Sequence, residues 1–371
     1  MKVVDIVGAR PQFVKLAPVL KALERHNREH PDRAIQEVLV HTGQHYDYEM
    51  SQVFFDELDL KAPDYHLGVG SGSHAHQTGE MLKRIEEVLI KEGPNLVVVY
   101  GDTNSTLAGA LAAAKLGIPV AHVEAGLRSF NREMPEEINR VLADHLSALL
   151  FCPTRTAVEN LRREGIIRGV HLVGDVMYDA LIRYADLAER KSSIMGELGL
   201  TPGAYALATV HRAESTDRPE RLEGIFRGLA ALARDGLTVV VPLHPRTRKA
   251  LSSLDANTDG LTRDLMLLEP VSYLDMLVLE KNARLILTDS GGVQKEAFFF
   301  RVPCLTLREE TEWVETVETG WNTLVGWDPQ RIACAARQAR PGVQAAAPYG
   351  DGRAAERIVS TLERAVGRYG I

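Results

Sequence analysis

Cysteine is scarce in this sequence, and long apolar runs are missing. The three cysteines, Cys152, Cys304 and Cys334, are widely spaced and odd in number, which suggests neither a disulfide framework nor a thiolate metal site. No apolar run approaches membrane-spanning length, and the opening MKVVDIVGAR lacks the apolar core and the cleavage site of a signal peptide. We therefore expect a cytoplasmic protein without a membrane segment.

An excess of positive charge is absent too. The net charge is −7, with basic and acidic residues mixed along the chain, so nothing indicates binding to nucleic acid or to an anionic membrane surface. No G-x-G-x-x-G follows the first apolar run and no phosphate-loop lysine motif occurs, so NAD binding loses its main support. His74 and His76 have no accompanying ligand pattern, and we expect no metal site.

The pattern of the remaining residues predicts two α/β domains. A chain of 371 residues, 45% of them apolar, suits two cores rather than one. Short β-branched runs alternate with segments of helical periodicity, as in parallel βαβ units. The predicted strands are KVVDIV, EVLVHT, NLVVVY, PVAHVE and ALLFCP, then YALATV, LTVVVPL, DLMLLE, ARLILT and PCLTL.

We expect both domains to be Rossmann-like and doubly wound. The first comprises residues 1–173 together with 352–371, and the second comprises residues 174–351. Helical spacing from Gln12 to His26 places apolar side chains on one face. The closing segment DGRAAERIVSTLERAV predicts an amphipathic helix that packs back on the first domain.

Polar clusters follow the predicted strands. In open α/β sheets, ligands bind beyond the carboxyl ends of the strands. The clusters are GARPQFVK, GDTNST and EAGLR in the first half, and HRAES, HPRT, DSGG and REETE in the second. Their convergence predicts an active site in a cleft at the interface of the two sheets.

The DSGG cluster predicts a phosphate site. Ser290, Gly291 and Gly292 stand at a strand-to-helix junction, where small residues expose backbone N–H groups and the positive end of the helix. An ordinary turn is the alternative. Glu296 lies inside the same helix, and an acidic residue near a phosphate site suits ribose hydroxyls.

Five other charged or titratable residues each have two interpretations. Arg10 and Lys15 open a helix, either as a clamp and a point charge for a diphosphate or as solvated charges. Asp102 either carries chemistry or caps the following helix. Glu124 lies among apolar neighbours, where an unpaired carboxylate is costly. His211 follows an apolar strand, where a satisfied core histidine is the alternative.

Several motifs share their order and spacing with a known family. They are GARPQFVKLAPV, HTGQH, YGDTNSTLAGALAA, AHVEAGLRS, MPEEINR, ATVHRAE, PLHPRT and LTDSGGVQKEA. From its first strand to about Gly326, the chain resembles the non-hydrolysing UDP-N-acetylglucosamine 2-epimerases. The resemblance implies a glycosyltransferase-B-like fold, with the sugar nucleotide in the cleft between two Rossmann-type domains.

The resemblance also implies roles for the residues that match the family's motifs. The catalytic positions are Asp102, Glu124, Glu136 and His211, the first three for acid/base work and His211 also for contact with uridine diphosphate. The substrate-binding positions are Arg10, Lys15, Arg140, Arg212, Ser290, Gly291, Gly292 and Glu296. It further implies a UDP-sugar substrate, a homodimer, and no cofactor.

The implied reaction inverts carbon 2 of the sugar, whose hydrogen no adjacent carbonyl acidifies. UDP leaves carbon 1 while a carboxylate takes the proton, and UDP adds back to the bound glycal as a proton returns to the opposite face. This route needs acid/base groups on both faces of the sugar and strong stabilisation of the leaving group. It needs neither a metal nor a redox cofactor.

Two segments depart from the commonest form of the family: SFNREM between EAGLR and PEE, and Trp313-Val314 where Arg-Pro is more usual. Both resemble the subgroup that acts on UDP-2,3-diacetamido-2,3-dideoxyglucuronic acid in O-antigen synthesis. The sequence therefore leaves two reactions open. One is the interconversion of UDP-N-acetylglucosamine and UDP-N-acetylmannosamine for surface polysaccharide synthesis, and the other is epimerisation of this diacetamido uronic acid. Arg132 and Arg308 either meet a uronate carboxylate or are solvated. A glycosyltransferase of the same fold is more distant, because it needs no paired carboxylates.

Overall fold

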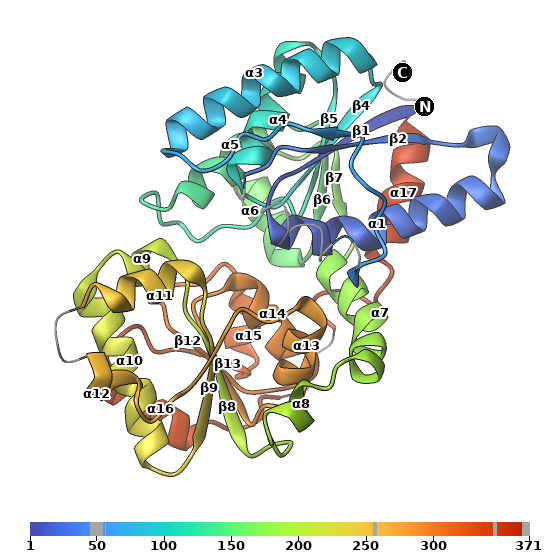
Figure 1. The fold of residues 1–371 in the computed structure, drawn as a ribbon. Helices are drawn as coiled ribbons and strands as arrows, with labels where there is room; N and C mark the ends of the chain where they lie inside the picture. Colours follow the sequence, from blue (N-terminus) through green and yellow to red (C-terminus); the bar gives the residue numbers. More distant parts are fainter. Residues whose placement is uncertain (45–54, 56, 255–257, 344–346, 366–371) are drawn as a thin grey trace. The chain divides into compact units, whose positions relative to one another are not determined.

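The chain forms two compact units, Met1–Ile182 with Ala347–Ile371, and Arg183–Ala346. The structure, a computed structural model, describes residues 1–44, 55, 57–254, 258–343 and 347–365. The HTGQH motif is described as far as Gln44, and its last residue, His45, lies outside the described residues. The division between the units falls within helix α7 (Val176–Lys191). Each unit contains one parallel sheet (Figure 1).

The N-terminal unit has a seven-stranded sheet in the order β3-β2-β1-β4-β5-β6-β7. All neighbouring strands in it are parallel. Strands β2 and β3 follow on one side of β1, and β4 to β7 follow on its other side. The topological switch point therefore lies between β1 and β4. The strands are β1 (Lys2–Val7), β2 (Gln36–His41), β3 (Tyr65–His66), β4 (Leu96–Tyr100), β5 (Val120–Val123), β6 (Leu149–Cys152) and β7 (Val170–Leu172).

Helices pack on this sheet and bury its aliphatic side chains. One core joins α3 and α4 to β1, β2 and β4. The closing helix, α17, lies against α1 (Figure 1), where Arg25 pairs with Glu356 at 2.5 Å and Arg33 with Glu363 at 2.6 Å. It therefore packs on the first unit, as predicted. The helices are α1 (Arg10–Glu29), α3 (His74–Glu92), α4 (Asn104–Lys115), α5 (Pro135–Leu146), α6 (Arg155–Arg163) and α17 (Ala354–Ala365).

The C-terminal unit repeats this topology with six strands in the order β10-β9-β8-β11-β12-β13. They are all parallel, and the switch point lies between β8 and β11. The strands are β8 (Tyr205–Thr209), β9 (Thr238–Pro242), β10 (Met266–Leu268), β11 (Leu285–Thr288), β12 (Cys304–Thr306) and β13 (Asn322–Leu324). Its helices are α8 (Ile194–Glu197), α9 (Ala213–Thr216), α10 (Pro219–Arg234), α11 (Pro245–Ser252), α12 (Thr258–Thr262), α13 (Tyr273–Asn282), α14 (Gly291–Phe300), α15 (Val314–Glu318) and α16 (Pro329–Gln338).

The prediction of two doubly wound parallel sheets is confirmed. Each predicted strand is present, and the additional strands β3, β7 and β13 are edge strands of two or three residues, too short to show a period. Helix α1 extends from Arg10 to Glu29 and contains Pro18, so it begins before and ends after the predicted range of Gln12 to His26.

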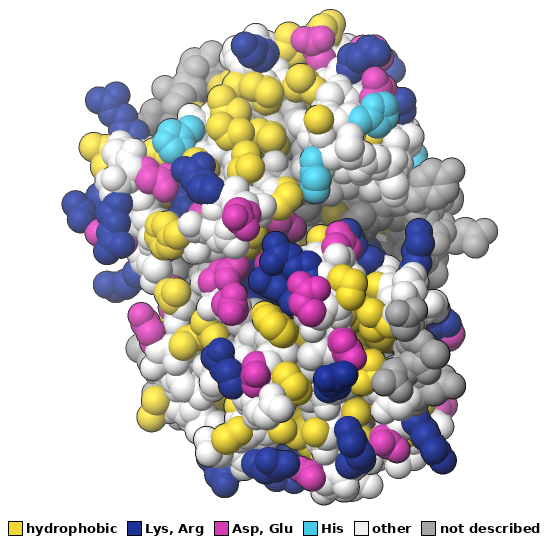
Figure 2. Space-filling view, turned by 90° about the vertical axis from the view of Figure 1, so that its left-hand side faces the viewer, with side chains coloured by type: hydrophobic (Ala, Val, Ile, Leu, Met, Phe, Trp, Pro, Cys, Tyr) yellow, Lys and Arg dark blue, Asp and Glu magenta, His cyan; other side chains and the backbone are white. Residues whose placement is uncertain are grey.

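Charges of both signs are interspersed on the molecular face shown in Figure 2. Several exposed charges of the molecule are paired with near neighbours, such as Arg162 with Glu159 at 2.7 Å and Arg227 with Glu223 at 2.6 Å. The surface charge is therefore largely balanced locally. Among the described residues, no helix is both long enough and apolar enough to cross a membrane.

Asp5 makes folding stability depend on pH. It lies on β1 with a side chain that accepts a hydrogen bond from the Tyr100 hydroxyl at 2.6 Å. Burial, followed by the nearby charge of Glu37, raises its pKa from 3.8 to about 8. The stability associated with the protonated carboxyl is therefore fully present below about pH 4 and is lost as pH rises towards about 8.

We expect Asp5→Asn to flatten this dependence, because asparagine stays neutral and keeps an acceptor for Tyr100. Urea unfolding at pH 5 and pH 8 measures the effect. Between these values the wild type should lose up to about 1.4 kcal/mol per pH unit relative to the variant. A wild type and a variant with parallel stability curves would contradict the raised pKa.

Candidate active site

The candidates of the N-terminal unit gather where β1, β4 and β5 end. Gln12, in the first turn of α1, accepts the N–H groups of Gly8 at 2.8 Å and Ala9 at 3.0 Å, and its Nε2 donates to the Tyr100 carbonyl at 2.8 Å. Its side chain thereby joins the turn after β1 to the end of β4 across the switch point. Arg10 is the first residue of α1, and burial lowers the pKa of its guanidinium.

Lys15 of α1 and Glu124, the residue after β5, form a buried ion pair. Their side chains are 9% and 5% exposed, so the buried carboxylate has the partner that its environment requires. Glu124 also has a φ of 73°. This left-handed conformation costs a residue with a side chain about 1–3 kcal/mol, and such strain clusters at active sites.

Gly101, the residue before Asp102, lies against this ion pair. Its φ is 62°, and a Cβ atom there would lie 2.8 Å from Lys15 Nζ and 3.3 Å from Glu124 Oε2. The left-handed conformation disfavours a side chain at this position, and a Cβ atom would also displace the Lys15 amine from its place beside Glu124. The first position of the GDTNST cluster therefore has to be glycine.

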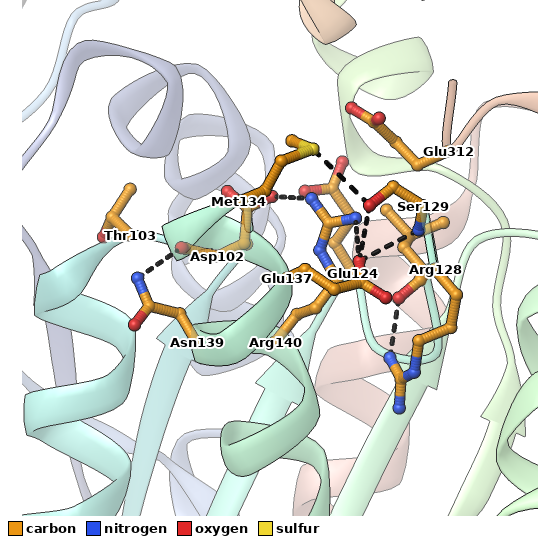
Figure 3. Close-up of polar contacts among 12 residues, drawn as sticks. Asp102, Thr103, Glu124, Arg128, Ser129, Met134, Glu137, Asn139, Arg140 and Glu312 are labelled. Carbon is orange, nitrogen blue, oxygen red and sulfur yellow. Dashed lines mark hydrogen bonds and ion pairs between the residues drawn. The ribbon is translucent and has the colours of Figure 1, made fainter. Parts of the chain in front are cut away.

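Asp102 does not cap the following helix. The N-cap of α4 is Thr103, whose hydroxyl accepts from the Thr106 N–H at 3.3 Å. The Asp102 carboxylate instead forms an ion pair with Arg140 of α5, and its carbonyl accepts from Asn139 Nδ2 at 2.9 Å (Figure 3). Two residues of α5 therefore hold Asp102, one by its side chain and one by its backbone.

Arg140 is only 1% exposed and also contacts Glu137, at 3.0 Å. Glu137 in turn accepts the Ser129 N–H and hydroxyl, both at 2.9 Å, and the Phe130 N–H at 3.0 Å (Figure 3). The loop after EAGLR is thus tied to the guanidinium that binds Asp102. Glu136, the position implied by the family resemblance, shares the first turn of α5 with Glu137. The contacts of Glu137 are visible only in the structure, and no sequence motif indicated them.

In the C-terminal unit, the fully buried Asp289 joins two polar clusters. Its carboxylate accepts the His211 N–H at 3.0 and 3.1 Å and the Arg212 N–H at 2.9 Å. The His211 ring is 39% exposed and lies 5.7 Å from the His244 ring, so His211 is not a core histidine. The clusters after β8, β9 and β11 therefore meet at the switch point. Asp289 is the first residue of DSGG, and its contacts with His211 and Arg212 are not visible in the sequence.

Helix α14 begins with the small residues of DSGG. Ser290 is its N-cap and accepts from the Val293 N–H at 3.5 Å, which leaves other first-turn N–H groups without intrahelical partners. A Cβ atom on Gly291 would lie 2.5 Å from Glu312 Oε1 and 3.0 Å from Trp313 Nε1. Glycine is therefore required at this position by packing against the REETEW segment, a reason that the motif alone does not reveal.

Glu296 lies on the buried face of α14 and is 6% exposed. It faces Tyr273 and Glu280 of α13. Burial and the neighbouring charge of Glu296 hold the pKa of Glu280 well above its usual value, which favours the protonated, hydrogen-donating form of Glu280 beside the Glu296 carboxylate. Helix α13 thereby supports Glu296.

Arg308 is 3% exposed and enclosed by carboxylates. Its guanidinium lies 3.1 Å from Glu214, 3.2 Å from Glu312 and 3.9 Å from Glu310. It is therefore not a solvated cation, whereas Arg132 is exposed.

The predicted site residues gather in two groups, one at the carboxyl edge of each sheet. The N-terminal unit holds Arg10, Lys15, Asp102, Glu124, Glu136 and Arg140, and the C-terminal unit holds His211, Arg212, Ser290, Gly291, Gly292 and Glu296. Their catalytic and binding roles stay predictions. Within the described ranges, no group of three or more His, Cys, Asp or Glu side chains is placed to hold a metal ion.

Comparison with known proteins gives a consistent result. A family model described as UDP-N-acetylglucosamine 2-epimerase matches residues 27–363. A Methanococcus maripaludis protein named UDP-N-acetylglucosamine 2-epimerase homolog is 54% identical over 98% of this chain and 99% of that protein. The UDP-2,3-diacetamido-2,3-dideoxy-D-glucuronate 2-epimerase of Pseudomonas aeruginosa is 47% identical over 98% of this chain and 100% of that protein. The crystal structure of Methanocaldococcus jannaschii UDP-GlcNAc 2-epimerase in complex with UDP-GlcNAc and UDP has a TM-score of 0.91 and 46% identity, and the match covers 98% of this chain and 100% of that one.

The two doubly wound sheets and these structural relatives define a glycosyltransferase-B-like α/β protein. The chain belongs to the UDP-N-acetylglucosamine 2-epimerase family. It is therefore an isomerase of the epimerase class, and the resemblance seen in its motifs is confirmed.

Proposed function

We propose that this epimerase interconverts UDP-N-acetylglucosamine and UDP-N-acetylmannosamine without net hydrolysis. The observation that carries the proposal is the pair of carboxylates at the carboxyl edge of the N-terminal sheet. Glu124 is ion-paired to the buried Lys15, and Asp102 to the buried Arg140. Carboxylates held by fixed partners suit proton transfer at a defined carbon atom.

In the proposed mechanism, one carboxylate removes the proton from carbon 2 as the bond between carbon 1 and the UDP oxygen breaks. The products held by the enzyme are 2-acetamidoglucal and UDP. UDP then adds back to carbon 1 while a second group delivers a proton to the opposite face of carbon 2. Asp102, Glu124 and Glu136 are the candidates for these transfers, and Lys15 and Arg140 orient two of them.

The C-terminal unit would supply the nucleotide contacts. The start of α14 offers N–H groups and the positive end of a helix to phosphate oxygens. His211 and Arg212 stand beside it because Asp289 holds their backbone, and Arg10 is proposed to add a guanidinium. Glu296 would accept hydrogen bonds from the ribose hydroxyls.

Proton NMR of UDP-N-acetylglucosamine with the enzyme in deuterated water tests the function. Deuterium should enter carbon 2 as UDP-N-acetylmannosamine accumulates, because the proton exchanges with solvent in the glycal state. Release of free sugar without label at carbon 2 would indicate transferase or hydrolase chemistry instead and would overturn the proposal.

The alternative substrate, UDP-2,3-diacetamido-2,3-dideoxyglucuronic acid, is supported by the identity to the Pseudomonas aeruginosa enzyme. In this structure Arg308 is enclosed by three carboxylates, which disfavours it as the partner of a uronate, and Arg132 is the remaining candidate. Comparison of kcat/KM for the two substrates decides between them, and Arg132→Gln should weaken only the uronate.

Ser290→Ala is expected to raise the Kd for UDP by about fivefold, since it removes a hydroxyl and an N-cap that together are worth about 1 kcal/mol. Isothermal titration calorimetry with UDP measures the effect. The matched control is Ser272→Ala, because Ser272 caps α13 in the same unit through the Asp275 N–H at 3.1 Å and has no proposed ligand contact. Equal loss of affinity in both variants would show that capping alone is responsible.

We also propose that the enzyme is a cytoplasmic homodimer that supplies precursors of surface polysaccharides. These points rest on the family resemblance and on the sequence. Multi-angle light scattering of the purified protein tests the dimer, and a monomeric mass at assay concentration would contradict it.

A further inference from the structure

His122 is a fully buried side chain that joins the two segments carrying Asp102 and Glu124. It lies on β5, two residues before Glu124. Its Nε2 is 2.7 Å from the carbonyl oxygen of Gly101, the residue before Asp102, and its Nδ1 is 2.7 Å from Asp144 Oδ1 on α5. The proposed mechanism gives it no role.

Both partners of the His122 ring are acceptors. The Gly101 carbonyl can only accept. The Asp144 carboxylate accepts from the Gly126 N–H at 3.1 Å and from Arg128 Nη1 at 2.7 Å. Burial raises the pKa of Asp144, but hydrogen bonds from His122 and Arg128 outweigh burial and hold the pKa below its usual value. Both ring nitrogens of His122 therefore face acceptors, Asp144 Oδ1 and the Gly101 carbonyl oxygen.

Asp144 extends the same network to the segment after Glu124. Its contacts with the N–H of Gly126 and with Arg128 fix the chain two and four residues beyond Glu124. Arg128 is itself held by Glu164 at 2.6 Å. One buried carboxylate thus fixes the Glu124 segment directly and contacts the Gly101 carbonyl through the His122 ring.

Gly101 is where these constraints meet. Its N–H donates to the Val123 carbonyl at 3.0 Å, and its Cα faces the Lys15–Glu124 pair. Glycine has few steric limits on its backbone angles, and the His122 ring contacts the carbonyl of the peptide group between Gly101 and Asp102 directly. This contact adds to those that Asn139 and Arg140 make with Asp102 itself.

We infer that His122 is a positioning residue that, through the Gly101 carbonyl, sets the place of Asp102 relative to Glu124. The inference rests on the proposed function, in which both carboxylates act on one sugar carbon. A displacement of about 1 Å in such a pair lowers turnover by about 10²-fold, whereas it leaves nucleotide contacts in the other unit unchanged. Loss of the His122 bond should therefore lower kcat and spare UDP binding.

The test compares His122→Phe, which removes the donors, with His122→Gln, which retains an N–H donor. We expect His122→Phe to lower kcat by about 10²-fold with the Kd for UDP changed less than about threefold, and His122→Gln to recover at least about tenfold of that loss. Tyr205→Phe is the matched control, because it removes a buried donor to a backbone carbonyl, Leu279 O at 2.5 Å, in the other unit. It should keep kcat despite a lowered Tm.

Two results would overturn the inference: a His122→Phe variant with wild-type kcat, or a loss in kcat that glutamine does not relieve. If His122→Phe does not fold, a measurement on the wild-type protein can still test the inference. Its ¹H–¹⁵N spectrum, with the ring assigned by its disappearance in His122→Gln, should show hydrogen on both nitrogens, and a singly protonated ring would contradict the bonding. If the wild-type enzyme never exchanges the carbon-2 proton, the proposed function is wrong. The ¹H–¹⁵N spectrum would still test the His122 hydrogen bonds, because it does not depend on activity.

Discussion

Replacement of Glu124 with glutamine is expected to lower kcat by about 10²- to 10⁴-fold, the range typical of losing an acid/base group. Glutamine has the same size and still offers an oxygen to Lys15, but it neither takes nor gives the carbon-2 proton. The epimerisation assay by proton NMR measures kcat, and calorimetry with UDP should give an affinity within about threefold of the wild type. Wild-type turnover would remove Glu124 from the mechanism.

Stability has to be measured alongside, because Lys15 is 7% exposed and would lose its charged partner. Breaking a buried ion pair on one side costs about 3–5 kcal/mol. The control is Glu92→Gln, the same chemical change at a carboxylate that pairs with Lys2 at 3.2 Å and accepts from the Tyr65 hydroxyl at 2.5 Å. This control should lose some Tm and keep its kcat, which separates proton transfer from stability.

The fold was predictable because its information is local. β-branched runs such as VVVY and LILT become the buried strands β4 and β11, and the polar residues after them necessarily fall at one edge of a parallel sheet. The sequence predicted that the sheets are doubly wound, but it did not predict the order of the individual strands. The strands β3, β7 and β13 were missed because two or three residues show no alternation.

The predicted site residues were found from motif positions, whereas the residues that hold them were not. His122 and Asp289 act through contacts with residues distant in sequence, Gly101 and His211. Glu137 contacts Arg140 one turn further along α5, and it also accepts from Ser129 in the preceding loop. A buried polar side chain acquires such a role only from its partners in space, and a single sequence does not contain them. The glycine motif does not reveal that Gly291 also makes room for Glu312 and Trp313.

Asp102→Asn should lose turnover to a similar extent, by about 10²- to 10⁴-fold, with a smaller cost in stability than Glu124→Gln. The reason is that Arg140 keeps a second carboxylate, Glu137 at 3.0 Å, when Asp102 is replaced. Lys15 is ion-paired with Glu124 and loses this charged partner when Glu124 is replaced. Tm measurements on both variants check this order.

The two variants should also differ in which substrate exchanges its carbon-2 proton. If Asp102 and Glu124 serve opposite faces of carbon 2, each variant retains the base for one epimer only. That epimer can still eliminate UDP, exchange the proton with solvent and return to its starting configuration. We therefore expect one variant to exchange deuterium into UDP-N-acetylglucosamine without inversion and the other to do so with UDP-N-acetylmannosamine. If one variant exchanges deuterium into neither epimer, the missing carboxylate acts in cleavage of the bond between carbon 1 and UDP. Both epimers need that cleavage, whereas each epimer needs a different base at carbon 2.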